Sequence, residues 1–287
     1  MMEVVLIILG TILLAPLAGG LLTGVDRIIT ARMQGRQGPP LLQPFYDLIK
    51  LWRKEAQITN TLQVFYAVIY LVFAVLSLVL FVLGQNLLLI IFVLTIGSGA
   101  MVLGALSTPS PYSQIGANRE ILQMLAYDPI LLITAVALYL VTGSFKLSEV
   151  VAYQTASGQP LLFVLPLVFL TMTYVLTIKM RKSPFDISAS HHAHQEIVRG
   201  ITTEYSGPYL ALLEIAHWFE VVLVLGLVAI FWANSWLMAL ILVGAVFLLE
   251  LLLDNITARL TYRWMLQSTW VVGMGLAVLN IAYLYLA

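Results

Sequence analysis

Long uncharged runs of apolar residues recur along the whole 287-residue chain, separated by shorter polar connections. Each run is close to the about 20 residues that an α-helix needs to cross the hydrocarbon core of a bilayer. The pattern therefore predicts an all-α polytopic membrane protein with eight transmembrane helices. The eight predicted spans are Val4–Val25, Val64–Gly84, Leu87–Leu106, Ile121–Val141, Leu161–Ile178, Tyr209–Trp232, Trp236–Asp254 and Leu266–Ala287.

The first polar connection, Asp26–Gln63, contains a segment with its own helical pattern. In Leu41–Glu55, LLQPFYDLIKLWRKE, apolar residues follow helical spacing while charged residues occupy the other side. This pattern predicts an amphipathic cytoplasmic helix at the membrane surface or beneath a partner, with a solvated connector as the alternative. The third connection, Ser107–Glu120, contains prolines and a glycine, so we expect it to be irregular up to Asn118-Arg119-Glu120.

The composition supports the membrane class and limits the chemistry. Charged residues are 10% of the chain, against about 25% in an average soluble domain. No linker or repeat interrupts the sequence, so we expect a single membrane domain over residues 1–287. The first apolar run lacks the basic start of a cleavable signal peptide. A net charge of zero gives no indication of nucleic-acid binding, and the absence of Cys excludes thiolate-held iron–sulfur clusters in this chain.

The positive charges are distributed very unevenly. Of the 14 Lys and Arg residues, all except Lys146 fall on odd-numbered connections between the predicted spans. By the positive-inside bias, the odd connections are cytoplasmic and both termini lie on the opposite side. Polar chemistry gathered on one side favours a membrane anchor for a large cytoplasmic partner over a solute transporter.

Ionisable residues inside the predicted spans are candidates for a proton path. A carboxylate at bilayer depth costs a few kcal/mol or more, so it normally faces a cavity, a partner or a proton path. Glu214, His217 and Glu220 are spaced by three residues and fit one helical stripe. Asp128, Glu250 and Asp254 are the other candidates. The alternative is that these acids pair with basic residues near helix ends and only fix packing.

The run Ser190–Glu196, SHHAHQE, concentrates three of the four histidines and a carboxylate. His191 and His194 are three residues apart, as metal ligands on one helical turn often are. No Cys or second distant histidine completes a tetrahedral set, so we predict no metal site. Hydrogen bonding to a partner or to the backbone, docking of a partner, and proton relay remain open for His191, His192, His194 and Glu196.

Several motifs resemble the H-type membrane subunit of respiratory complex I. They are Ala31–Glu55, Arg119 with Gln123–Asp128, Ser183–Asp186 and Thr203–Gly207, and they keep the order of that family. The first loop lacks a longer glycine–proline element, and SHHAHQE stands in place of an acidic run. The stretches RKSPFDISASHHAHQE, TTEYSG and EIAHWFE look like the membrane anchor of energy-converting nickel–iron hydrogenases, such as the B-type subunit of Ech-type hydrogenase and its formate hydrogenlyase and CO-linked relatives.

This resemblance implies a non-catalytic subunit of a prokaryotic inner (plasma) membrane complex. The nickel–iron centre and iron–sulfur clusters would lie in a nickel–iron large subunit and an iron–sulfur small subunit, and an antiporter-like membrane subunit would be a further partner. The complex would couple electron transfer from ferredoxin, formate or CO to protons with translocation of H+ or Na+. The alternatives are a quinone-module subunit of a complex I-type NADH or F420H2 dehydrogenase, and a stand-alone ion or solute transporter.

The resemblance also implies roles for individual residues. Glu204, from the Thr-Glu-Tyr-Ser-Gly motif, would join Asp128, Glu214 and Glu220 in a lateral proton path. The expected interface with the hydrogenase module comprises Arg32, Arg36, Asp47, Arg119, Asp186, His191, His192, His194 and Glu196.

Overall fold

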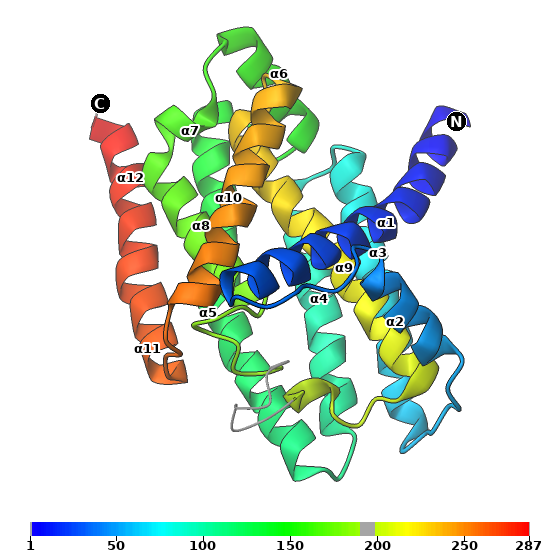
Figure 1. Cartoon of the computed structure of the whole chain (residues 1–287). Helices are drawn as coiled ribbons and strands as arrows, with labels where there is room; N and C mark the ends of the chain where they lie inside the picture. The colour runs from blue at the N-terminus through cyan, green and yellow to red at the C-terminus, as the bar shows by residue number, and fades with distance from the viewer. Residues whose placement is uncertain (1, 190–198, 287) are drawn as a thin grey trace. The chain divides into compact units, whose positions relative to one another are not determined.

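The computed structural model describes residues 2–189 and 199–286, and the regular structure in these ranges is helical (Figure 1). One isolated antiparallel bridge, between Asn86 and Lys146, is the only strand-like pairing within them. The chain divides into two compact units. The first unit comprises Met1–Val79, Val93–Ile121 and Asp186–Val222, and the second comprises Leu80–Phe92, Leu122–Phe185 and Leu223–Ala287.

Twelve α-helices lie in the described residues. In chain order they are α1 (Met2–Met33), α2 (Gln43–Trp52), α3 (Thr61–Val82), α4 (Leu87–Leu106), α5 (Pro111–Thr142), α6 (Leu147–Ser157), α7 (Leu161–Val164), α8 (Pro166–Lys179), α9 (Gly207–Ala229), α10 (Trp236–Ile256), α11 (Tyr262–Gln267) and α12 (Met274–Leu286). Short 3-10 turns form η1 (Gly200–Thr202) and η2 (Ile230–Trp232), and a π-helical turn forms η3 (Ser268–Gly273).

Seven helical segments of the described chain are long and apolar enough to cross a membrane. They are Met2–Met33, Thr61–Val82, Leu87–Leu106, Pro111–Thr142, Gly207–Trp232, Trp236–Ile256 and Tyr262–Leu286. A helix pairs its own backbone N–H and C=O groups. This is necessary in the bilayer core, because no water is available there to form hydrogen bonds with them. The prediction of an all-α membrane protein is confirmed, and these segments coincide with seven of the eight predicted spans.

The eighth predicted span, Leu161–Ile178, is not one continuous helix. It is broken at Leu165, where φ is −121° and ψ is 50°, and α8 restarts at Pro166 with 14 residues. Proline has no backbone N–H and disfavours the helical conformation of the residue before it. The prediction of a single helix is therefore wrong at this position.

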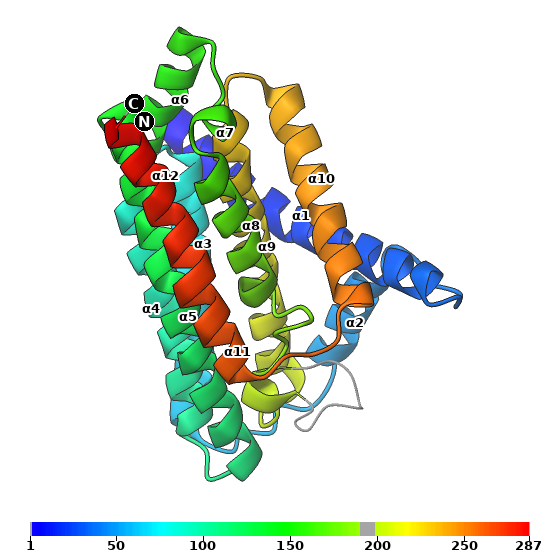
Figure 2. The same cartoon turned by 90° about the vertical axis from the view of Figure 1, so that its left-hand side faces the viewer.

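Asn280 on α12 satisfies the backbone groups that this break leaves free. Its Oδ1 accepts hydrogen bonds from the N–H groups of Leu167 (2.9 Å) and Val168 (3.3 Å), and its Nδ2 donates to the carbonyl of Val164 (3.2 Å). The helices α8 and α12 lie side by side in the second unit (Figure 2). One buried amide thus stabilises the broken helix from its neighbour.

The first and third connections between the predicted spans are also more helical than the sequence indicated. The third connection is not irregular throughout, because α5 already begins at Pro111, and proline is well tolerated in the first turn of a helix. Gly116 lets this turn approach η1 closely, since a Cβ there would lie 2.3 Å from the backbone nitrogen of Ile201. In the first connection, α2 confirms the predicted helix, while α1 continues as far as Met33.

Glycines on α1 hold α2 and α9 close in the first unit. A Cβ on Gly19 would lie 2.6 Å from Cβ of Trp218, and one on Gly20 would lie 2.5 Å from the ring of Phe45. The rings of Phe45 and Trp218 meet edge to face, with centroids 5.3 Å apart. The surface helix α2 is therefore packed onto two of the spanning helices.

Candidate functional site

Glu220 is the most enclosed carboxylate among the candidates of the first unit. Glu220 lies on α9, a helix long and apolar enough to span the membrane, and it is 3% exposed. The hydroxyl of Tyr70 on α3 donates to its Oε2 at 2.8 Å, and the hydroxyl of Ser98 on α4 lies 3.5 Å from its Oε1. Three helices thus supply groups that can stabilise a negative charge or exchange a proton at one point.

His217 lies one turn before Glu220 on α9. Its Nδ1 is 3.9 Å from Oε2 of Glu220, and this buried nitrogen has no hydrogen-bond partner among the described residues. The structure therefore brings two predicted proton-path residues together. Glu214 also lies on α9 and is half-buried. The imidazole nitrogen and the carboxylate therefore lie just beyond hydrogen-bonding distance of each other.

Sequence analysis missed Tyr70 and Ser98. A signal for Tyr70 was present, because Gln63, Tyr70 and Ser77 recur at intervals of seven in an otherwise apolar helix. Seven residues are close to two helical turns, so these side chains share one face. All three are buried in the structure. A buried polar face on a spanning helix is a usual sign of a polar partner elsewhere in the protein.

The predicted interface residues Arg119 and Asp186 both lie in the first unit. Arg119 donates to the carbonyl of Ile187 at 3.3 Å, and Asp186 is buried. Beside Arg119, the buried Glu120 accepts a short hydrogen bond from the hydroxyl of Ser188. Glu120 is a further residue that the sequence analysis did not single out.

Ser188 is also bonded to the chain that precedes α9. The N–H of Ile201 donates to the carbonyl of Ser188 at 3.1 Å. This hydrogen bond joins the chain segment before residues 190–198 to the segment after them. The predicted interface residues His191, His192, His194 and Glu196 lie outside the described residues. Their alternative roles remain predictions.

The Thr-Glu-Tyr-Ser-Gly motif places Tyr205 in the interior of the first unit. A Cβ on Gly104 would lie 2.2 Å from the Tyr205 hydroxyl, so only glycine leaves room for this ring. Burial raises the pKa of the Tyr205 phenol above its ordinary value, which keeps it neutral. The neighbouring Glu204 is half-buried.

In the first connection, Asp47 joins α2 to α1. Its Oδ2 lies 2.7 Å from a guanidinium nitrogen of Arg27, and its Oδ1 accepts from Gln43 at 2.8 Å. Burial raises the pKa of Asp47, but these hydrogen bonds and the positive charges of Arg27 and Lys50 together outweigh it, so the pKa lies below its ordinary value. Arg32 and Arg36 are exposed, as a docking role requires, and Arg36 donates to Gln34.

The remaining proton-path candidates lie in the second unit. Glu250 is fully buried on α10, and Asp254 follows one turn later and accepts a hydrogen bond from the N–H of Ser183 at 2.8 Å. Asp128 is half-buried on α5. Beside it, the hydroxyl of Tyr127 accepts from Lys179 at 3.2 Å.

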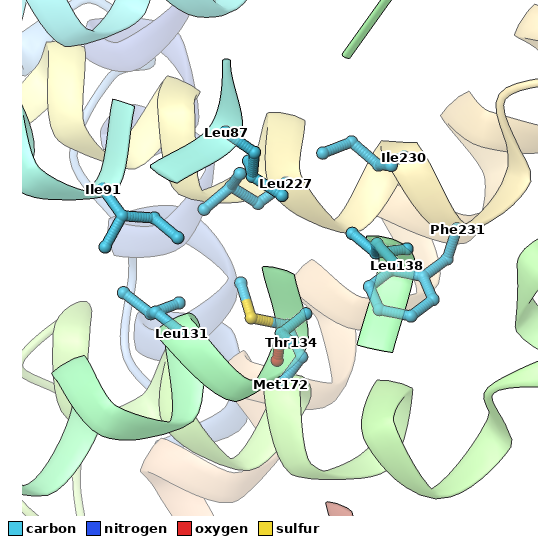
Figure 3. A pocket seen from close by; sticks show the side chains of 9 residues that line it. All are labelled: Leu87, Ile91, Leu131, Thr134, Leu138, Met172, Leu227, Ile230 and Phe231. Carbon is cyan, nitrogen blue, oxygen red and sulfur yellow. The ribbon is translucent and has the colours of Figure 1, made fainter. Parts of the chain in front are cut away.

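An apolar cavity of ≈ 10 Å³ lies in the second unit (Figure 3). Its single polar lining residue is Thr134, and the hydroxyl of this residue already donates a hydrogen bond to the carbonyl of Ile130 at 2.8 Å. The other lining residues are Leu87, Ile91, Leu131, Leu138, Met172, Leu227, Ile230 and Phe231. A space at the lower size limit for one water molecule and without polar partners is a packing gap.

Across residues 2–189 and 199–286, no three His, Cys, Asp or Glu side chains gather in a way that could hold a metal ion. No cofactor site is evident in this part of the chain.

Comparisons with known proteins agree with the helical architecture. Residues 4–285 match the family described as NADH dehydrogenase. The chain is 31% identical over 290 residues to hydrogenase-4 component C of Escherichia coli, covering 90% of this chain and 89% of that protein. It is 29% identical over 307 residues to the H subunit of the NADH-quinone oxidoreductase of Helicobacter pylori, covering 92% and 91%.

A solved structure is similar over almost the whole chain. It is that of the membrane-bound sulfane sulfur reductase, an archaeal respiratory membrane complex. The TM-score is 0.88 and the identity is 26%, with 97% of this chain and 98% of that chain covered.

The fold and the buried carboxylates define a multi-pass membrane subunit of the type found in complex I-related respiratory and hydrogenase complexes. The chain belongs to the NADH dehydrogenase family. Its resemblance to the H-type subunit of complex I and to hydrogenase anchors is thereby confirmed.

Proposed function

We propose that the chain is the membrane anchor and coupling subunit of an energy-converting nickel–iron hydrogenase in a prokaryotic plasma membrane. The similarity to hydrogenase-4 component C over about nine-tenths of both chains supports this assignment. The run SHHAHQE, in the place of an acidic run in the quinone-reducing relatives, supports it further. The complex couples electron transfer from ferredoxin, formate or CO to protons with the translocation of H+ or Na+.

The coupling role rests on one observation. Glu220 is a buried carboxylate in a spanning helix, with hydroxyl groups from two other helices and an imidazole around it. Such a group is costly in a membrane and is normally retained for function. We assign Glu204, Glu214, His217 and Glu220 to the proton path in the first unit, and Asp128, Glu250 and Asp254 to its part in the second.

The proposed orientation follows the charges. The chain acts as a single membrane domain over residues 1–287, and α7 and α8 together form the eighth crossing, so both termini are extracytoplasmic. The odd-numbered connections then face the cytoplasm and hold the nickel–iron and iron–sulfur subunits, which carry the redox centres. The proposed contact residues on this side are Arg32, Arg36, Asp47, Arg119, Asp186, His191, His192, His194 and Glu196. An antiporter-like subunit is the lateral partner within the membrane.

Purification of the intact complex tests this function. We expect evolution of hydrogen from a reduced ferredoxin-type donor and no bound quinone. The second candidate, a quinone-module subunit of a complex I-type NADH or F420H2 dehydrogenase, is favoured by the similarity to the H subunit of NADH-quinone oxidoreductase. Tightly bound quinone together with quinone reductase activity would replace the first assignment by the second.

A further inference from the structure

Pro129 lies inside α5 and leaves one backbone carbonyl of this spanning helix without its usual donor. The helix continues through Pro129 from Pro111 to Thr142. Proline has no backbone N–H, so the carbonyl four residues earlier, that of Leu125, lacks its helical hydrogen bond. Asp128, which we assign to the proton path, directly precedes Pro129 in the same turn. The conformation of this turn therefore determines where Asp128 lies.

Trp270 supplies a donor to this carbonyl from another part of the second unit. Its indole Nε1 donates to the carbonyl of Leu125 at 3.2 Å, although the two residues are 145 positions apart. A free backbone carbonyl is costly in a bilayer, and proline is tolerated in spanning helices where neighbouring groups satisfy the freed carbonyl. This hydrogen bond therefore ties the turn of α5 that contains Pro129 to η3.

The π-helical turn η3 is held in place by α8 at both of its ends. Ser268 is its first residue, and the Ser268 hydroxyl lies 2.6 Å from the hydroxyl of Tyr174. Gly273 is its last residue, and the Gly273 carbonyl lies 3.2 Å from the hydroxyl of Thr171. Such turns within α-helices are frequently found at functional sites. Trp270 is thus carried by a segment with a fixed position in the unit.

A second contact joins η3 to α5 on the other side of Pro129. A Cβ on Gly273 would lie 3.0 Å from Cδ1 of Ile130, the residue that follows Pro129. Ile130 is buried. The segment η3 therefore contacts α5 both before Pro129, at the Leu125 carbonyl, and after it. These two contacts fix the turn that carries Asp128 relative to α8.

We propose that Trp270 is a positioning residue for Asp128. Its indole N–H holds the carbonyl of Leu125 and thereby fixes the turn from which Asp128 takes part in proton transfer. Trp270 does not carry a proton itself, because an indole is a donor only. The inference rests on the proposed function for the role of Asp128, whereas the link between Trp270 and the turn can be measured without it.

Hydrogen exchange of the intact complex measures this link independently of ion transport. Trp270→Phe keeps an aromatic ring and removes the donor. We expect amide exchange in the α5 turn around Pro129 to become faster, on the order of five-fold, as for the loss of one hydrogen bond. Trp264→Phe is the matched control, because Trp264 is exposed on the neighbouring α11. Equal exchange in the two variants would overturn the inference.

A double-mutant cycle tests whether Trp270 acts on translocation through this carbonyl. Pro129→Ala restores a backbone N–H to α5 and so gives the Leu125 carbonyl a donor within its own helix. We expect Trp270→Phe to lower ion translocation in proteoliposomes on the order of five-fold in the wild-type background and much less in the Pro129→Ala background. Hydrogen evolution with a soluble electron donor should be retained. An equal loss in both backgrounds would show that the ring acts by packing and would contradict the inference.

A conservative variant provides the comparison if Pro129→Ala does not assemble or transport ions. Histidine keeps a ring N–H that phenylalanine lacks, so we expect Trp270→His to translocate ions faster than Trp270→Phe. No recovery in Trp270→His, or wild-type translocation in Trp270→Phe, would overturn the positioning role. The absence of any ion transport in the wild type contradicts the proposed function instead, and the hydrogen-exchange result then still decides whether Trp270 holds the turn.

Discussion

The Tyr70 hydroxyl donates a hydrogen bond of 2.8 Å to Oε2 of Glu220, although the two residues are 150 positions apart in the sequence. This bond links α3 to α9 in the first unit. Together with the Ser98 hydroxyl and the His217 imidazole, it surrounds this buried carboxylate with polar groups. Tyr70 is therefore a direct partner of the carboxylate that we assign to the proton path.

Removal of that donor is the first prediction. Tyr70→Phe deletes a hydrogen bond to a charged group, which typically contributes about 1.5–3 kcal/mol. We expect ion translocation by the complex in proteoliposomes to fall on the order of ten-fold or more. Tyr112→Phe is the control, because Tyr112 is exposed on α5. Equal rates in the two variants would remove Tyr70 from the coupling site.

Glu214→Gln tests the path along α9. Glu214 is half-buried on the same helix as His217 and Glu220, and a glutamine amide cannot carry a proton. We expect ion translocation to be abolished while hydrogen evolution with a soluble electron donor largely survives. Glu149→Gln, a change at an exposed acid, is the matched control. Unchanged pumping in Glu214→Gln would exclude Glu214 from the path.

Much of the fold could be predicted because the bilayer imposes a simple rule on sequence. A long apolar run must be helical to satisfy its backbone, so seven spanning helices are readable from hydrophobicity alone. The break at Leu165 was missed because the span was predicted from the number of consecutive apolar residues. Pro166 is compatible with such a run, but it changes the backbone conformation of the residue before it. The helical start of α5 at Pro111 was missed for the opposite reason, since proline was read only as a helix breaker.

The site was less predictable than the fold. Helical spacing places Glu220 and His217 on one stripe, and they meet in the structure. Tyr70 and Ser98 reach Glu220 from distant parts of the sequence, and a single sequence does not show which distant residues come together in space.

Gly19→Ala tests the packing of α1. The new methyl group would lie 2.6 Å from Cβ of Trp218 and close to its backbone, so α1 and α9 must separate. Overpacking of this kind typically costs about 1–3 kcal/mol. We expect a lower melting temperature of the purified complex and a changed Trp218 fluorescence. Gly10→Ala on the same helix meets no atom within 4 Å and should do neither. Equal behaviour of the two variants would contradict the close contact.

Asn280→Ala tests the support of the broken helix. The change removes one acceptor and one donor, leaving N–H groups of Leu167 and Val168 and the carbonyl of Val164 unsatisfied. Each buried unsatisfied group costs about 1–3 kcal/mol. We expect a clear loss of thermal stability and faster hydrogen exchange at the start of α8. The exposed Asn118 gives the control, Asn118→Ala. Normal exchange in Asn280→Ala would show that the break is satisfied in another way.

The ion pair between Asp47 and Arg27 predicts that the attachment of α2 to α1 depends on pH. The pKa of Asp47 in the folded chain lies below the ordinary value of 3.8, because the hydrogen bonds from Arg27 and Gln43 and the charges of Arg27 and Lys50 together outweigh burial. The stabilisation is therefore present above that ordinary value and is lost as the pH falls through the lower pKa of the folded chain. More than a third of the Asp47 side chain is exposed, so solvent screening limits the contribution to less than about 1 kcal/mol.

Hydrogen exchange of the α2 amides measures this contribution. At neutral pH, Asp47→Asn should accelerate their exchange by less than about five-fold, the equivalent of 1 kcal/mol. The difference from the wild type should shrink in high salt and disappear at a pH below the folded pKa of Asp47, where both side chains are uncharged. Glu149→Gln, which removes the acid of a different exposed pair, should leave α2 unchanged. A difference that persists at low pH would mean that the asparagine disturbs α2 by its shape and not by the loss of charge.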